Sequence, residues 1–494
     1  MERWVIITGI IGLYLALTLA IGLRAGRDTT KSVTGYVAGD RGFGLLVMYF
    51  VTGASVFSAF AFLGGPGWAY SRGAAAFYIL SYGVLGIAPW YILGPRAARL
   101  GRRKGFVTQA QLLVGRFPSR GLSAMIALLS IMAFIPYITL QMRGAGIVIE
   151  AVSDGNIPLW LGAAVAYGIV ILYVLVSGVA AVGWTNTFQG IFMLVIAWVL
   201  GIYLPIKLYG GIGPMFEAIQ LARPELLSVP GLAADGSPWS WGAYSSAILV
   251  SAIGLTMWPH LFMKAFTARD DRILRRTVVL FPTFQLFLIP VFIIGFAGVL
   301  FVDELAQPDF ILPHLILSVD LPVILVGLFC AGALSASMST GDALLHASAS
   351  VLVEDGVRPF RRMSEQAQRA WMRVVVVLAG GVAYWFALDP DQSLVVLLLT
   401  SYGIIAQFAP PIVAAMYWRR ATTPGVVAGL VAGSLTTLLF FLNPELRPWE
   451  VHEGILGLCV HLPVLVGVSL LTSPQAPTHV DPFVDPDLTE STSP

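Results

Sequence analysis

The chain has 494 residues, of which 57% are hydrophobic and only 11% are charged, and its formal net charge is +2. A soluble domain carries about 25% charged residues, so the composition excludes an ordinary soluble protein, and so small a net charge gives no sign of nucleic-acid binding. Apolar windows of the length that crosses a bilayer, about 20 residues, recur along the chain. Cys330 and Cys459 lie in apolar segments and give neither a disulfide framework nor a metal-binding spacing. The sequence predicts an all-α polytopic membrane protein.

Thirteen transmembrane helices are predicted in chain order. The first is interpreted as a retained helix and not as a signal peptide, because it is as long as a full span and no small-residue cleavage site follows it. The predicted helices cover residues 4–23, 43–66, 75–93, 122–152, 159–176, 180–208, 241–267, 278–301, 321–353, 374–388, 393–418, 423–442 and 451–471.

The distribution of lysine and arginine gives the orientation. With the N-terminus outside, 23 of the 29 Lys and Arg residues fall in inside loops, and Arg143 lies within a predicted helix. Cytoplasmic loops of membrane proteins carry such an excess of Lys and Arg. The sequence therefore predicts an external N-terminus and a cytoplasmic C-terminus. The acidic, Pro-rich segment 473–494 has no periodicity and is predicted to be a disordered cytoplasmic tail.

Two predicted helices contain interruptions. Helix 43–66 includes Gly53 and ends in Gly64-Gly65-Pro66, and helix 241–267 contains Pro259, which removes a backbone donor. Interrupted helices at corresponding positions of two inverted halves are typical of transporter sites. These two lie five helices apart, so five-helix units that start with them have opposite topology. The alternative is that Gly and Pro are simply common in membrane helices.

The segment 331–340 places hydroxyl side chains inside an apolar helix. Ala336, Ser339 and Thr340 stand at i, i+3 and i+4 and so share one face. A backbone carbonyl and two hydroxyls on one face suit a small hard cation. The alternative is helix packing, because small and hydroxyl residues also allow membrane helices to approach closely.

Three motifs resemble those of the sodium:solute symporter family. GVAAVGWTNTFQG at 178–190 is similar to the family signature, PHLFMKAF at 259–266 to an element of its proline and acetate members, and SMST at 337–340 to its sodium-site helix. The resemblance spans roughly residues 5–440 in order. It implies a LeuT-type core of ten helices in two inverted repeats. The domains are then an extra helix and cytoplasmic loop at 1–41, repeats at 42–210 and 241–420, two further helices at 421–472, and the tail.

The resemblance also implies a sodium site between the first and eighth core helices. Its ligands are the carbonyl groups of Ala54, Phe57 and Ala336 and the hydroxyl groups of Ser339 and Thr340. Two residues depart from the family pattern. Asn186 stands at the sodium exit where most members have Asp, which puts ion release and the identity of the ion in doubt, and Val56 stands where the proline transporter has Asp.

Candidate substrate residues gather at the two interruptions and on two other helices. Unwound helix ends offer free backbone groups and a partial positive charge suited to a carboxylate. Trp258 is interpreted as a lid over a small apolar substrate or as a packing aromatic, and His260 as a substrate contact or as a partner of a nearby carbonyl. The full set is Ser55, Ser58, Gln141, Trp258, His260, Tyr402 and Gln407.

The predicted function is Na⁺-coupled symport of a small organic solute, with a short monocarboxylate favoured over an amino acid or pantothenate. H⁺ coupling stays open because of Asn186. An intramembrane enzyme is disfavoured because no GxSxG or HExxH motif occurs, and a membrane sensor remains a less favoured alternative. We expect no organic cofactor and no obligatory protein partner. The expected location is the bacterial inner membrane.

Overall fold

The computed structural model describes residues 3–25, 32–302, 305–389 and 394–485. All long regular elements among these residues are helices, with two isolated β-bridges. Nine of the described helices are long and apolar enough to cross a membrane, and two bent helix pairs raise that number to 11. The prediction of an all-α membrane protein is confirmed. Each of the thirteen predicted segments overlaps a helix, but the number of crossings stays a prediction.

The first half of the chain carries the first interrupted helix. Its elements are α1 (Arg3–Ala25), α2 (Val33–Ala38), α3 (Leu45–Val56), η2 (Phe60–Gly64), α4 (Gly65–Arg72), α5 (Phe77–Ile87), α6 (Trp90–Lys104), α7 (Gln109–Arg116), α8 (Arg120–Val152), α9 (Leu159–Tyr209) and α10 (Ile212–Ala222).

The second half carries the second interruption and the hydroxyl-bearing helix. Its elements are α11 (Trp241–Leu255), α12 (Pro259–Phe262), α13 (Lys264–Thr267), α14 (Asp271–Gln285), α15 (Leu288–Gly298), α16 (Ile311–Ser318), α17 (Val323–Val351), η6 (Leu352–Val357), α18 (Glu365–Ala387), α19 (Leu394–Ile405), η7 (Ala406–Phe408), α20 (Ala409–Tyr417), α21 (Thr423–Leu442), α22 (Glu453–Leu471) and α23 (Pro477–Val484).

Local sequence sets several helix starts. A side-chain oxygen at the N-cap accepts a hydrogen bond from a backbone N–H of the first turn, which satisfies a donor that the helix itself cannot. Such caps begin α8, α11, α14, α18 and α21, at Ser119, Ser240, Asp270, Ser364 and Thr422.

The element α9 contains two helices joined at Gly178. A straight helix of 51 residues would be about 77 Å long at 1.5 Å per residue, more than twice the thickness of a bilayer core. Gly178 interrupts it with φ 56° and ψ −146°. A Cβ at this residue would lie 2.7 Å from the Tyr36 side chain. Glycine at 178 therefore separates the predicted helices 159–176 and 180–208.

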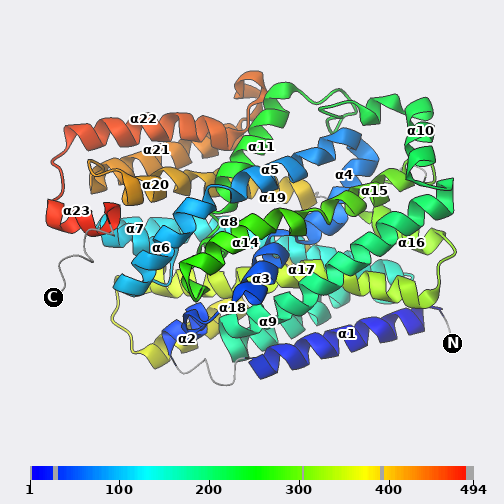
Figure 1. Ribbon diagram of the computed structural model, residues 1–494, viewed down its shortest axis with the longest axis horizontal. Coiled ribbons are helices and arrows are strands. Elements are labelled where there is room, and N and C mark those ends of the chain that lie inside the picture. The colour runs from blue at the N-terminus through cyan, green and yellow to red at the C-terminus, as the bar shows by residue number, and fades with distance from the viewer. Residues whose placement is uncertain (1–2, 26–31, 303–304, 390–393, 486–494) are drawn as a thin grey trace.

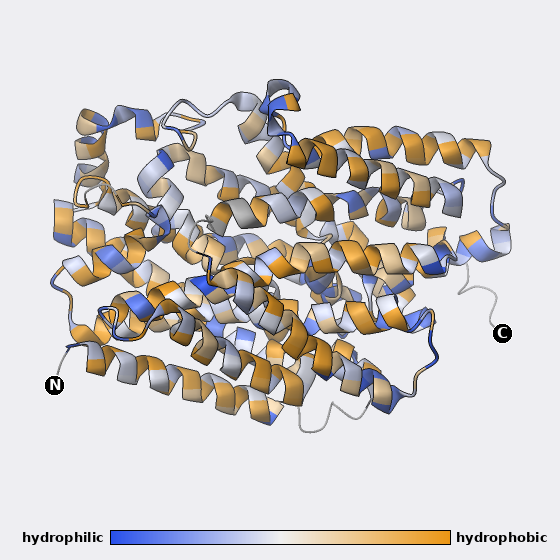
Figure 2. Cartoon of the chain, turned by 180° about the vertical axis from the view of Figure 1, so that it is seen from behind, coloured by the Kyte–Doolittle hydropathy of each residue, from blue (hydrophilic) through white to orange (hydrophobic). Residues whose placement is uncertain are grey.

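The helix α17 lies at the centre of the bundle. It packs against α1, α3, α8, α9 and α18, and from Phe329 onward every residue of the helix is buried. The hydroxyl groups of 335–340 therefore face protein and not lipid. Figure 2 shows hydrophobic residues along the outer helices and hydrophilic ones concentrated at helix ends and in the interior. Exposed apolar side chains such as Leu13 of α1, Trp385 of α18 and Leu435 of α21 suit contact with lipid tails.

Residues 473–485 contradict the prediction of a disordered tail. Residues 477–484 form α23, which lies at the opposite end of the molecule from the start of α1 (Figure 1). Arg419 pairs with Asp481 and Asp485, and Arg96 donates to the Phe483 carbonyl. The acidic side chains that suggest disorder in the sequence are ion-pair partners of the basic helix ends. Residues 486–494 lie outside the described part of the chain.

Candidate ion and substrate site

The first interruption lies between α3 and η2. Phe57, with φ −92° and ψ 92°, ends α3, and the chain turns by 57° before continuing. The free backbone donors beyond the break find side-chain partners. Ala59 N donates to Gln141 Oε1 at 3.0 Å, and Phe60 N donates to Ser58 Oγ at 3.2 Å. The predicted unwinding of this helix at membrane depth is present, and a glutamine of α8 stabilises it.

Hydroxyl groups of α17 meet backbone oxygens of α3 at this break. Ser339 Oγ donates to the Ala54 carbonyl at 2.9 Å and to the Ala336 carbonyl at 3.2 Å. Thr340 Oγ1 lies 3.2 Å from the Ala54 carbonyl and 3.3 Å from the Ser55 carbonyl. All of these residues are fully buried. The structure thus brings four of the five predicted sodium ligands together and adds the carbonyl oxygen of Ser55, a residue that the sequence analysis assigns to substrate.

Phe57, the fifth predicted ligand, adjoins this group without sharing its hydrogen bonds. Its backbone N–H donates to the Gly53 carbonyl, which closes the last turn of α3. Its ring lies 5.0–5.8 Å from those of Phe281, Phe284 and Phe287. Aromatic packing against α14 and against Phe287, the N-cap residue of α15, holds the end of α3 in place.

Asn186 lies beside the same break. Its Nδ2 donates to Ser55 Oγ at 3.2 Å, while its buried Oδ1 accepts no hydrogen bond from a described residue. A buried acid is nevertheless close by. Asp342 Oδ2 accepts hydrogen bonds from Thr185 at 3.0 Å and from Tyr173 at 2.9 Å. The sequence analysis does not include Asp342 among the candidate site residues, although its position two residues after Thr340 is a signal that could have found it.

The second interruption builds an aromatic cluster. The α11–α12 pair is bent by 44°, and Trp258 at the break is 1% exposed. The Trp258 ring centroid lies 4.9 Å from that of Tyr137, 5.6 Å from that of His260 and 5.7 Å from that of Tyr402. Three predicted substrate residues are therefore brought together. Tyr137, which sequence reasoning misses, joins them from α8.

Buried donors without hydrogen-bond partners among the described residues lie near the two breaks. Tyr137 and Gln141 stand one turn apart on α8 and so share a face. Gln141 Nε2 and Trp258 Nε1 make no hydrogen bond of normal geometry with a described residue. The His260 ring lies against the backbone of Ser55, also without such a bond. A buried donor without a partner costs about 1–3 kcal/mol, so these groups are suited to an incoming acceptor.

Two polar side chains, those of Gln407 and Arg143, make their hydrogen bonds outside the aromatic cluster. Gln407 donates to Thr437 Oγ1 at 3.2 Å and to the Gly454 carbonyl at 2.9 Å, and His461 Nδ1 lies 3.2 Å from its Oε1. These contacts join η7 to α21 and α22, away from the aromatic cluster. Arg143 donates to the Asp389 carbonyl and to Gln307 Oε1, the internal pairing that a membrane-embedded arginine needs.

Comparison with known proteins identifies the family. The model of the sodium:solute symporter family matches residues 36–433. The chain belongs to this family. It is 30% identical to an uncharacterised symporter, YhjB, of Bacillus subtilis, with 93% of this chain and 95% of the relative covered. It is 27% identical to the sodium/pantothenate symporter of Escherichia coli, with 87% and 89% covered. A monocarboxylate transport permease of Rhizobium johnstonii is 25% identical, with 94% and 96% covered.

A solved structure supports the fold. The substrate-bound, outward-open structure of a Na⁺-coupled sialic acid symporter superposes with a TM-score of 0.79 at 17% identity, covering 95% of this chain and 98% of the other. Family and fold are those of membrane transporters and not of enzymes. Co-transport of Na⁺ is the coupling that the family implies.

Proposed function

We propose that this protein is a Na⁺-coupled symporter that carries a small organic monocarboxylate by alternating access. The observation that carries the proposal is the meeting of Ser339 and Thr340 with the Ala54 carbonyl, beside buried donors that lack partners among the described residues. Hydroxyl and carbonyl oxygens suit a hard monovalent cation, and N–H donors suit a carboxylate. Both kinds of group contact the same broken helix.

The proposed Na⁺ ligands are the carbonyls of Ala54, Phe57 and Ala336 and the hydroxyls of Ser339 and Thr340. A bound Na⁺ takes the oxygen lone pairs, and the two hydroxyl hydrogens rotate away from the Ala54 carbonyl to other acceptors. The set contains no carboxylate, so the ion keeps a net positive charge. That charge favours an anionic substrate nearby, which couples the two binding events.

The proposed substrate contacts are Ser55, Ser58, Gln141, Trp258, His260 and Tyr402. Gln141 Nε2 and the His260 ring offer donors to the carboxylate, and Trp258 and Tyr402 form an apolar wall for a short chain. Gln407 supports the helix that carries Tyr402. The similarity to a pantothenate symporter favours pantothenate as the second candidate. Pantothenate is also a monocarboxylate, so both candidates share the chemistry of recognition.

The proposed topology has thirteen crossings with five-plus-five inverted repeats. The start of α1 and the helix α23 lie at opposite ends of the molecule (Figure 1), as an odd number of crossings requires. The excess of Lys and Arg in the predicted inside loops favours a cytoplasmic location for the α23 end. A bacterial inner membrane is the proposed location.

Uptake by purified protein in proteoliposomes tests the proposal. Labelled acetate, lactate, pyruvate, pantothenate and proline are offered with an imposed Na⁺ gradient or an imposed H⁺ gradient. We expect the Na⁺ gradient to drive uptake of one carboxylate. Uptake that follows the H⁺ gradient and ignores Na⁺ would overturn the Na⁺ assignment, and uptake of proline alone would overturn the substrate class.

A further inference from the structure

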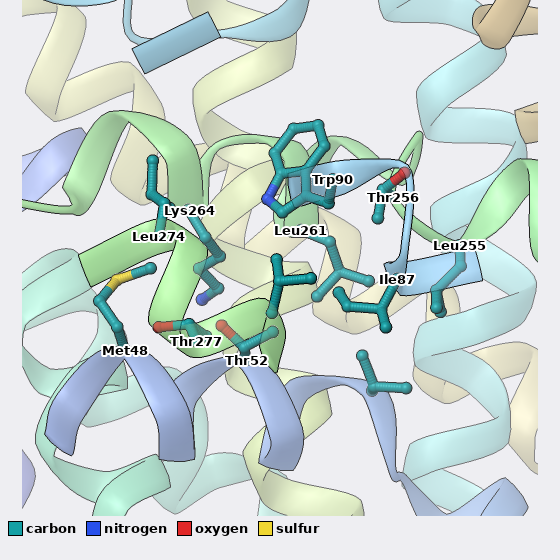
Figure 3. A pocket seen from close by; sticks show the side chains of 12 residues that line it. Met48, Thr52, Ile87, Trp90, Leu255, Thr256, Leu261, Lys264, Leu274 and Thr277 are labelled. Carbon is teal, nitrogen blue, oxygen red and sulfur yellow. The ribbon is translucent and has the colours of Figure 1, made fainter. Parts of the chain in front are cut away.

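A small internal cavity lies beside the predicted substrate region and contains a buried lysine. Figure 3 shows its lining, with the Lys264 amine directed toward the space near Thr52 and Thr277. Lys264 is the only charged residue among the twelve described lining residues. The lining also includes Thr52, Thr256 and Thr277. The rest of it is apolar and comes from α3, α5, α6, α11, α12 and α14. In this conformation the cavity, about 10 Å³, holds about one water molecule.

Lys264 carries its charge without a close partner. The residue is 5% exposed, and its amine makes no hydrogen bond and no ion pair within 4.0 Å with any part of the chain that the structure describes. Its attractive electrostatic partner is Asp342 of α17. The Thr277 hydroxyl donates to the Ile273 carbonyl, and it can donate to an anion instead by rotating away from that carbonyl. A buried ammonium is costly unless it is paired, so the cavity is suited to an anion.

The position of Lys264 connects the candidate substrate site to the basic end of the molecule. His260 stands four residues earlier, and a second small cavity is lined by both residues together with Thr267 and His346. Two residues after Lys264, the Phe266 carbonyl accepts a hydrogen bond from Arg41, which also binds the Gly101 and Phe106 carbonyls. Lys264 therefore lies between His260 and the Arg41 contacts that close the basic end.

We infer that Lys264, Thr52 and Thr277 form a second carboxylate subsite, which holds the substrate anion as it passes between the central site and the basic end. The inference rests on the proposed function. One ammonium and two hydroxyls bind one carboxylate once the Thr277 hydroxyl turns away from the Ile273 carbonyl. The apolar part of the wall admits a short chain but gives a second charge no partner. The cavity opens to substrate when α3 and α14 separate, a motion of the kind that alternating access requires. The anion then leaves along Lys264, and the cation leaves along Asp342.

Transport measured separately from the two membrane faces tests this subsite. Proteoliposomes of one orientation are loaded with the carboxylate that the wild type carries fastest among acetate, lactate, pyruvate and pantothenate. We expect K264Q to raise the KM for transport from the basic face by about tenfold, as loss of a charge-assisted contact predicts, and to change the KM from the opposite face little. K264R keeps the cation and should restore the wild-type KM. K207Q removes an exposed lysine in the last turn of α9, outside the proposed subsite, and is the matched control.

Failure of the inference is distinguishable from failure of the proposed function. If the wild type carries none of the four acids, the proposed function fails and the subsite fails with it. If the wild type transports but K264Q alters both KM values equally or neither, only the subsite is overturned. Where K264Q does not fold, T277V decides in its place: a KM raised about threefold from the basic face supports the subsite, and an unchanged KM overturns it.

Discussion

The candidate site has an ion side, where hydroxyls of α17 meet backbone carbonyls, and a substrate side, where the candidate substrate contacts lie. The polar groups of the two sides differ in their hydrogen bonding. On the ion side, Ser339 and Thr340 hydrogen-bond to carbonyls of α3 and α17. On the substrate side, Gln141 Nε2, Trp258 Nε1 and the ring nitrogens of His260 have no such partners among described residues. Since both sides are buried, the difference is not one of solvent access. Oxygens that hydrogen-bond to each other can exchange those bonds for a cation, whereas unpartnered donors need a ligand with acceptors.

The largest expected effect comes from removing hydroxyl oxygens of the ion side. S339A and T340A each remove one hydroxyl oxygen from the group around the Ala54 carbonyl. Because a hydrogen bond to a charged group contributes about 1.5–3 kcal/mol, each variant should raise the Na⁺ concentration for half-maximal uptake by about 10–100-fold. Na⁺ titration of uptake in proteoliposomes measures this value.

The control for the ion side is T436A. Thr436 of α21 donates to a carbonyl of its own helix at 2.8 Å, so T436A tests the loss of a helical hydroxyl that lies outside the ion site. If S339A and T340A leave the Na⁺ titration as unchanged as T436A does, these hydroxyls pack helices and do not bind the ion.

The substrate side is expected to give the next largest effect. Gln141 has two separable roles, because its Oε1 accepts from Ala59 N while its Nε2 has no partner among described residues. Q141L removes both groups and should raise the substrate KM by about tenfold or more, as loss of a buried donor predicts. The measurement is uptake against substrate concentration at saturating Na⁺.

A second variant of Gln141 separates recognition from support of the broken helix. Q141E keeps an acceptor for Ala59 N but replaces the donor with an acid that repels a carboxylate. If Nε2 contacts substrate, Q141E impairs uptake at least as much as Q141L does. A mild effect of Q141E, with a strong effect of Q141L, would instead assign Gln141 to the backbone alone.

The two sides also differ in how well sequence reasoning finds them. Helical spacing in one short segment places Ala336, Ser339 and Thr340 on one face, so this grouping is predictable from the amino-acid sequence alone, and its binding of an ion stays a prediction. The substrate side is assembled from aromatic residues of α8, α12, α19 and the α11–α12 break. No spacing within one helix reveals that Tyr137 and Tyr402 both contact Trp258. The partners of Gln407 and the docking of α23 depend on contacts between helices that are distant in sequence, and periodicity within a segment carries no information about them.

Gln407 extends the comparison, because its side chain is hydrogen-bonded to neighbouring helices and its proposed role is structural. Q407L breaks the bonds to Thr437 and Gly454 and leaves His461 Nδ1 without its partner. We expect a loss of about 1–3 kcal/mol in the free energy of unfolding, seen as a lower Tm of the detergent-solubilised protein, with the substrate KM unchanged. Gln220 is exposed on α10, and Q220L is the matched control. A raised KM with normal stability would instead restore the sequence prediction that Gln407 contacts substrate.

The smallest expected effect concerns the acid that stands near the ion side. Asn186 and Asp342 approach the same region, since Thr185, next to Asn186, donates to Asp342. N186D adds a carboxylate beside Ser55 and should lower the Na⁺ concentration for half-maximal uptake by about twofold to fivefold, as one added charge at moderate distance predicts. D342N should raise it, because the cation then loses its nearby negative charge.

The double variant N186D/D342N decides whether the two positions substitute for one another. If Asp342 supplies the charge that most family members place at position 186, N186D restores Na⁺ dependence to the D342N protein. N156D adds an acid at an exposed residue after α8 and should restore nothing. If D342N folds but is impaired and N186D does not rescue it, Asp342 acts through its hydrogen bonds to Tyr173 and Thr185 and not through its charge. The exit of the ion then depends on helix packing at the Asp342 face of α17.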